Sequence, residues 1–206
     1  MTFAYQRRHR WVAALFYMSV AEGRSMNARA QDVLAFWFHE LTPAQWFKKD
    51  PKMDQQIVER FSDVMSKAAV CECFEWRRSP RGRLAEVIVL DQFSRNIYRD
   101  DARSFACDSL ALALAQEAVA SGADQSLSAV ERSFLYMPYM HSESAVIHSV
   151  ALQLFNQPGL ESNLEFEKRH KAIIDRFGRY PHRNAVLGRT STPEEVEFLK
   201  QPGSSF

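Results

Sequence analysis

Apolar residues recur along this chain mainly at intervals of three and four positions, the spacing that gathers side chains on one face of an α-helix. Alternation with a period of two, which is typical of strands, is nowhere sustained. The pattern predicts an all-α protein of about eight helices joined by short loops. Short connections favour antiparallel neighbours, so we expect stacked helical hairpins.

Capping residues predict where these helices begin and end. Asp50 and Pro51 form a cap followed by proline at the first helical position. Other starts are expected at the caps Asn27 and Ser142, at Arg83 and Arg103, and at three capping boxes: Ser128 with Glu131, Ser162 with Glu165, and Thr192 with Glu195. Ends are expected at Glu40, at Ser94, before Gly122, Pro138 and Pro158, and at Gly178.

The composition is that of one globular domain without cross-links. In 206 residues, 46% are hydrophobic, enough for a substantial core. The 26 Lys and Arg against 25 Asp and Glu argue against a dedicated nucleic-acid binder. Three cysteines are an odd number, so we expect free thiols and a cytoplasmic protein. The oligomeric state cannot be read from these features.

The first 26 residues form a separate segment ahead of a single domain expected over residues 27–206. Basic residues at positions 7–10 precede an apolar run at 11–21, which is the layout of a short signal peptide. The run is shorter than the roughly 20 residues that cross a bilayer, so no membrane role is expected. The alternative is that Met26 is the true start, because a helix opening follows it at once. We favour this second interpretation.

Two ionisable residues fall on apolar helix faces. Asp91 shares a stripe with Leu84, Val87 and Ile88, and Arg95 one turn later is a local partner. His170 is expected to point inward together with Phe166, Ile173 and Phe177. A buried carboxylate requires a cation or several donors, so both positions are candidate site residues. The plain alternative is a neutral core histidine and a purely structural ion pair.

Further polar residues stand where helices are expected to start or end. His141 and Glu143 lie at a predicted helix start, where backbone N–H groups favour anions. Asn96 follows Arg95 near the end of the central helix and could serve only as a turn residue.

The segment from Arg176 to Arg189 contains four arginines and one histidine without an acidic residue. Forked guanidinium donors suit carboxylates and phosphates, so the segment predicts anion recognition by Arg176, Arg179, Arg183, Asn184 and Arg189, with Arg95 and Asn96 nearby. The competing interpretation is a structural network, in which Arg179, Arg183 and Arg189 neutralise Asp91, Glu143, Asp100 or Asp101. A buried network can also form the wall of a pocket, so both interpretations remain open.

These motifs together resemble a bacterial family described as domain of unknown function 924. The resemblance rests on residues 33–38, 46–47, 90–99, 137–143, His170, 176–184, 187–189 and 191–195, and it covers about residues 27–199. It implies an all-α, tetratricopeptide-like helical fold and no established reaction. The chain has Ser94 where many members have proline, and its first 25 residues lie outside the family pattern.

Two functions of different classes follow. The first is a tetratricopeptide-like binding module for an anionic small molecule or an acidic peptide. The second is an enzyme acting on a small carboxylate or phosphate substrate. In the enzyme, histidine would be the general acid or base and a carboxylate would orient it, with candidates His141, His170, His182, Asp91 and Glu143. No familiar catalytic motif is present, which counts against the enzyme.

No cofactor or metal is expected. The sequence has neither a phosphate-cradling loop nor a dinucleotide-binding glycine motif. Residues of metal-ligating type occur at His141, Glu143, His148, His170 and His182. The surrounding arginines would repel a cation, so a metal site is the weakest hypothesis.

Overall fold

Helices dominate the part of the chain that the computed structural model describes, residues 28–205, and no strand occurs there. Residues 28–35 are helical and continue into a π-helical turn, Phe36–Glu40. Eight further α-helices lie within this range: α2 (Pro51–Ala69), α3 (Pro80–Ile88), α4 (Ser94–Ile97), α5 (Asp108–Ala120), α6 (Ala129–Met140), α7 (Ala145–Phe155), α8 (Glu161–Phe177) and α9 (Pro193–Leu199). The predicted all-α class is confirmed for these residues.

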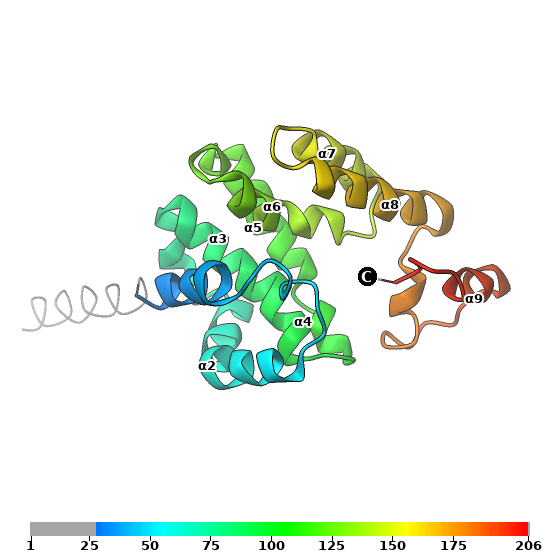
Figure 1. The fold of residues 1–206 in the computed structure, drawn as a ribbon, viewed down its shortest axis with the longest axis horizontal. Helices are drawn as coiled ribbons and strands as arrows, with labels where there is room; N and C mark the ends of the chain where they lie inside the picture. Colours follow the sequence, from blue (N-terminus) through cyan, green and yellow to red (C-terminus); the bar gives the residue numbers. More distant parts are fainter. Residues whose placement is uncertain (1–27, 206) are drawn as a thin grey trace, which may run out of the picture.

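Consecutive helices pack against one another along most of the chain (Figure 1). Helix α5 packs on α6, α6 on α7, and α7 on α8, while α3 lies against both α5 and α6. The loop between α7 and α8 spans only residues 156–160, so the chain reverses direction there. Helix α9 stands at the far end of the molecule, beyond α8.

The centre of the fold is one helical run from Pro80 to Ile97. It consists of α3, a π-helical turn at Val89–Phe93, and α4. All residues from Leu84 to Ser94 are buried. The expected start at Arg83 is wrong by three residues, because the Ser79 side chain accepts a hydrogen bond from the Gly82 N–H and Pro80 occupies the first turn. The expected end at Ser94 is also early, since the run continues through α4.

An aromatic cluster joins this central run to its neighbours. The ring of Phe93 lies 5.6 Å from that of Trp37 and 4.9 Å from that of Phe61, and Phe134 of α6 meets Trp37 edge to face. Trp37, Phe61, Phe93 and Phe134 are all buried. Such contacts add to the stabilisation from apolar burial, so the cluster holds the N-terminal helices against α6.

Several predicted helix ends are confirmed. Asp50 caps α2 with its side chain, and the capping boxes of Ser128 with Glu131 and Thr192 with Glu195 are both formed. Gly122 and Gly178 have the left-handed backbone conformation that ends α5 and α8.

Four other boundaries differ from expectation. Ser144 rather than Ser142 precedes α7, and Ser162 lies inside α8, which begins at Glu161. Pro138 lies inside α6, whose residues 133–140 are all buried, so burial of this face outweighs the lost backbone hydrogen bond. Residues 102–105 form a 3₁₀ turn, and α5 begins only at Asp108.

The expectations for the first 26 residues, and for Asn27 as a cap, lie outside the described residues. Within 28–205, no helix has the length and apolar character needed to cross a membrane.

Replacement of Gly82 by alanine is expected to destabilise the fold. A Cβ at this position would lie 2.0 Å from the Trp76 carbonyl oxygen, a backbone atom that no side-chain rotation can move away. We expect the free energy of unfolding to fall by about 2–3 kcal/mol in urea titration, because overpacking forces the backbone to shift. Gly122→Ala is the control: its φ is +71° with no neighbouring atom within 4 Å, and the left-handed conformation costs about 1 kcal/mol. An equal loss in both variants would contradict the packing argument.

Candidate functional site

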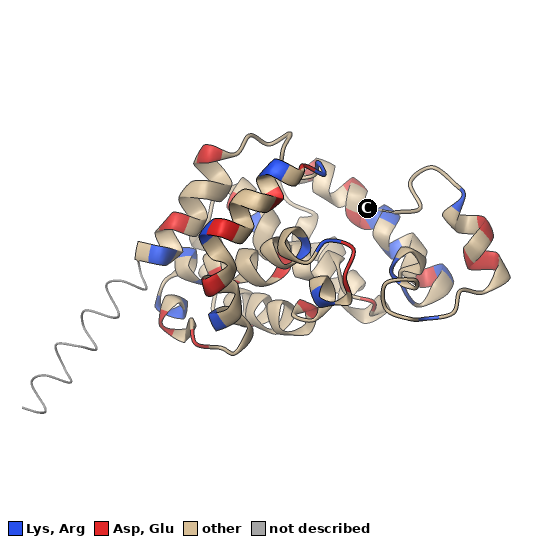
Figure 2. Cartoon of the chain, turned by 90° about the horizontal axis from the view of Figure 1, so that it is seen from below, with Lys and Arg blue, Asp and Glu red and all other residues tan. Residues whose placement is uncertain are grey.

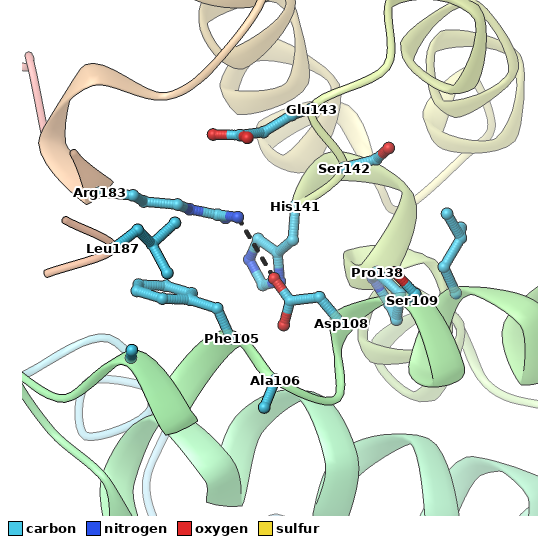
Figure 3. Close-up of a pocket in the computed structure, with 12 residues that line it drawn as sticks. Phe105, Ala106, Asp108, Ser109, Pro138, His141, Ser142, Glu143, Arg183 and Leu187 are labelled. Atoms are coloured by element: carbon cyan, nitrogen blue, oxygen red, sulfur yellow. Dashed lines mark hydrogen bonds and ion pairs between the residues drawn. The ribbon is translucent and has the colours of Figure 1, made fainter. Parts of the chain in front are cut away.

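A pocket of about 300 Å³ lies where four segments of the chain meet. They are the 3₁₀ turn with the start of α5 (residues 102–112), the end of α6, the α6–α7 loop and the segment of residues 176–189, which we call the basic segment (Figure 3). The apolar lining residues are Ala102, Phe105, Ala106, Leu112, Pro138 and Leu187, and the polar ones are Asp108, Ser109, His141, Ser142, Glu143 and Arg183. The sequence-predicted candidates His141, Glu143 and Arg183 are therefore brought together.

Asp91 is not itself a lining residue, but it is hydrogen-bonded to His141, which is. It belongs to the π-helical turn of the central run, and its side chain is 1% exposed. Its Oδ1 lies 2.7 Å from Nδ1 of His141 and 3.3 Å from the guanidinium of Arg95, and its Oδ2 accepts from Gln92 at 2.6 Å. The predicted local partner Arg95 is confirmed. Nitrogen atoms of three residues thus converge on one buried carboxylate.

Asp91 is ionised in this setting. Burial by itself raises the pKa of the carboxyl, but the charge of Arg95 and the contact with His141 outweigh burial and hold the pKa well below its usual range. An ionised carboxylate can only accept a hydrogen bond, so Nδ1 of His141 carries the proton. In the tautomer that this contact selects, the unprotonated nitrogen is Nε2.

Arg183 is a buried cation with few partners. Its side chain is 8% exposed, and its guanidinium carbon lies 4.6 Å from the ring centres of both Phe105 and Tyr180. Within residues 28–205 the one hydrogen bond of this side chain runs from an Nη to Oδ2 of Asp108, 3.3 Å away, and its buried Nε has no acceptor. Burial lowers the pKa of Arg183, and the neighbouring Arg95 lowers it further.

Asp108 is shared between two arginines. Its Oδ2 accepts from Arg95 at 3.0 Å as well as from Arg183, and its buried Oδ1 has no donor among the described residues. Arg95 in turn divides its charge between Asp108 and Asp91. Sequence reasoning missed Asp108, because it predicted a helix from Arg103 onward, whereas α5 begins at Asp108.

Glu143 fastens the basic segment to the α6–α7 loop. It forms a two-point ion pair with Arg189, at 2.6 and 2.9 Å, and accepts from the backbone N–H of Tyr180 at 2.7 Å. Burial raises the pKa of Glu143, but the donors from Arg189 and Tyr180 lower it by more. Arg189 and Glu143 were predicted partners, and the ion pair confirms them.

A second buried polar pair supports the same loop from behind. The side chains of His148 and Glu167 are completely buried, with 2.7 Å between Nδ1 and Oε1. Nε2 of His148 lies 2.8 Å from the Ser142 carbonyl oxygen, so the pair ties α7 and α8 to the residue next to His141. Burial raises the pKa of Glu167. Glu167 was missed, although it precedes His170 by one helical turn and shares its inward stripe.

His170 and His182 pack against the ring of Tyr180 and do not line the pocket. Their ring centres are 5.8 and 5.5 Å from that of Tyr180. Burial lowers the pKa of His170 to about 3 and that of His182 to about 4, so both are neutral at neutral pH. The expectation that His170 points inward is confirmed, whereas Phe166 is half exposed, because its position on α8 faces away from the neighbouring helices.

The remaining candidates serve structural contacts away from the pocket. Arg176 pairs with Glu194, and Arg179 forms a two-point ion pair with Glu195. Asn184 donates to Ser191 and Glu195, and Asn96 donates to Asp54 of α2.

Figure 2 shows acidic residues of α9 at the same end of the molecule as the basic segment. The partners proposed from sequence for Arg179 and Arg183 are therefore wrong, because the acids that face them lie on α9 and α5.

No group of three or more His, Cys, Asp and Glu side chains in residues 28–205 is arranged to hold a metal ion. Three of the five residues of metal-ligating type are engaged by other side chains: His141 by Asp91, Glu143 by Arg189 and His148 by Glu167.

The ion pair between Arg179 and Glu195, which anchors the basic segment on α9, predicts that part of the stability of the fold is lost at low pH. Hydrogen bonds from Arg179, together with that from the Thr192 N–H, lower the pKa of Glu195 from 4.5 to about 2. The folded state therefore binds its proton later than the unfolded chain, and the stabilisation is complete above about pH 5 and is lost as the pH falls toward 2. Between pH 5 and pH 3 the unfolding free energy of Glu195→Gln should fall less steeply than that of the unchanged protein. Glu197→Gln, on the exposed face of the same helix, should follow the unchanged protein, and parallel curves for all three proteins would contradict this anchor.

Comparisons with known proteins agree with this architecture. No curated protein matches the chain. A solved structure described as a protein of unknown function, ATU0120, from Agrobacterium tumefaciens is 39% identical, with a TM-score of 0.80 over 84% of this chain and 97% of the other. Residues 33–203 match the family described as "Bacterial protein of unknown function (DUF924)". The match includes every segment that lines the pocket, and the chain belongs to this DUF924 family.

Proposed function

We propose that this protein binds a small anion in the pocket between Arg183 and His141. The observation that carries the proposal is the state of Arg183: its guanidinium is almost fully buried and makes a single 3.3 Å hydrogen bond in the described part of the chain. Buried arginines are normally matched by carboxylates or phosphates through paired donors. An anion in the pocket would supply the missing acceptor.

The local charges support the same conclusion. Two arginines, Arg95 and Arg183, share Asp108, while Asp91 divides its charge between Arg95 and His141. Neither arginine has a carboxylate of its own. Because interactions between charges are strong where water is scarce, an added negative charge at Arg183 would be favourable.

The geometry favours a small ligand over an acidic peptide. Arg176, Arg179 and Arg189 are already paired with Glu194, Glu195 and Glu143, so they offer no free row of cations. A volume of about 300 Å³ lies at the lower end of the range for small-molecule pockets. The apolar residues in the lining suit a ligand with a short hydrocarbon part, such as a carboxylate of a few carbons.

The tetratricopeptide-like superhelix implied by the family resemblance is part of the same proposal. It is supported by the consecutive packing of α5, α6, α7 and α8. In such stacks the binding site uses residues from several successive helices, as the pocket uses α5, α6 and the α6–α7 loop.

An enzyme that acts on a small anionic substrate is the second candidate. The hydrogen-bonded pair of His141 and Asp91 favours it, because a buried carboxylate behind a histidine is a common arrangement for general acid–base catalysis. The anion-binding role of Arg183 is shared by both candidates.

Thermal unfolding in the presence of acetate, butyrate and inorganic phosphate tests the proposal. A ligand at ten times its dissociation constant adds about 1.4 kcal/mol, so we expect the melting temperature to rise by about 3–5 °C with at least one of these anions. Arg183→Gln should abolish the rise, whereas Arg176→Gln, which removes an exposed arginine of the same segment, should retain it. Titration calorimetry would confirm one site per chain.

No rise with any of the three anions, or an equal rise in Arg183→Gln, would overturn the proposal. Arg183→Lys guards against misfolding, since it keeps the charge and should retain a reduced shift.

A further inference from the structure

We propose that the pocket is a catalytic site that hydrolyses small carboxylic esters, with His141 as the general base. The inference rests on the proposed function in one respect: Arg183 is the group that favours negative charge in the pocket. The juxtaposition that carries it is a histidine oriented by a buried carboxylate on one wall and an undersaturated buried guanidinium on another (Figure 3).

His141 is set up to accept a proton from the pocket. Its Nδ1 is bound to Asp91, and its ring makes no other hydrogen bond to residues 28–205. The ring lines the pocket, so the basic Nε2 is the nitrogen available to a molecule bound there. A general base needs this combination of a fixed ring and a free lone pair.

The backbone around His141 is held from both sides. The Tyr180 hydroxyl donates to the Met140 carbonyl oxygen, and His148 bonds the Ser142 carbonyl oxygen. His141 also ends α6, where its N–H is bound to the Met137 carbonyl oxygen. A catalytic residue is more effective when its position is determined in advance, and three elements determine this one.

Water is the nucleophile that the pocket admits. Ser109 and Ser142 line it, but neither hydroxyl is hydrogen-bonded to His141, and Ser142 Oγ accepts from the Ser144 N–H instead. In the first step Nε2 takes a proton from water while the water oxygen bonds to the ester carbon. The carbonyl electron pair moves onto its oxygen, which becomes negative.

In the second step the tetrahedral intermediate breaks down to the products. The carbonyl re-forms, the bond to the alcohol oxygen breaks, and the proton on Nε2 passes to that oxygen. The products are an alcohol and a carboxylic acid, which ionises at neutral pH. No oxidant, reductant or third reactant is consumed.

Arg183 contributes most where the charge develops. The ester is neutral, whereas the tetrahedral intermediate is an anion, so a buried cation stabilises the intermediate more than the substrate. The carboxylate product is also an anion and should bind in the same place. The anion affinity of the pocket is then affinity for the product.

The apolar lining residues favour the acyl part of the ester. Phe105, Leu112, Pro138 and Leu187 are among the residues that line a volume of about 300 Å³. A volume at the lower end of the range for small-molecule pockets suits a short acyl chain better than a long one. The substrate class is therefore a short-chain carboxylic ester.

Hydrolysis of p-nitrophenyl acetate, butyrate and octanoate by the full chain tests the proposal. We expect saturable hydrolysis of the two short esters, with kcat/KM falling at least 10-fold for octanoate. His141→Gln should lower kcat/KM by about 100-fold or more, the usual contribution of a general base. His39→Gln is the matched control, since His39 is exposed and does not line the pocket, and it should leave the rate unchanged.

Two further readouts distinguish catalysis from a structural role. Butyrate should inhibit competitively, and Arg183→Gln should remove both the inhibition and most of kcat. Asp91 is a positioning residue, so Asp91→Asn should displace the pH dependence of kcat/KM, while the thermal unfolding of each variant checks that it is folded.

The outcomes separate this inference from the proposed function. Anion binding that depends on Arg183, without hydrolysis above the rate of His141→Gln, would overturn the catalytic inference and leave the binding proposal intact. Equal rates in His141→Gln and His39→Gln variants that unfold like the unchanged protein would also overturn it. Absence of both anion binding and hydrolysis would overturn both.

Discussion

The ionised carboxylate of Asp91 is the constraint on which the rest of the site depends. It lies in the π-helical turn of a central run whose neighbours are apolar, and an unpaired charge there would be severely destabilising. Arg95 forms an ion pair with it from the next helical turn, and His141 forms a hydrogen bond with it from the end of α6, 50 residues later in the chain. Inserted π-helical turns are frequent at functional sites because they redirect a side chain without ending the helix. Here the turn places a carboxylate behind a histidine.

The parts around Asp91 are tied together by polar contacts between segments that are distant in sequence. Glu143 joins the α6–α7 loop to Arg189 and Tyr180, while His148 and Glu167 join the same loop to α8. Glu195 fastens the basic segment to α9. Since each of these carboxylates is bound by two or more donors or by a fully buried partner, the loop that carries His141 is held rigidly. The contacts that hold this loop in place therefore also hold residues that line the pocket.

Arg183 is the exception within this network. The other arginines of its segment have carboxylates of their own, whereas Arg183 shares Asp108 with Arg95 and packs between two aromatic rings. Stacking stabilises a guanidinium but does not satisfy its donors. Because Arg176, Arg179 and Arg189 are paired, the arginine of this segment that is short of an acceptor is the one that lines the pocket. The incomplete pairing of Arg183 and the orientation of His141 are the two features that point to a function.

The sequence by itself determined the helical class, several helix ends, and the identity of most polar residues at the centre. Periodicity and capping are local properties, so Asp91, His170 and the caps at Asp50, Ser128 and Thr192 could be recognised without a fold. The distribution of partners could not, because it depends on which helices meet. Only the tertiary structure decided that Arg179 pairs with an acid of α9 and that Asn96 donates to an acid of α2. It also decided that Asp108 pairs with Arg183 and that Glu167 pairs with His148. Pairing of charges acts over a few ångströms in space, whatever their separation along the chain.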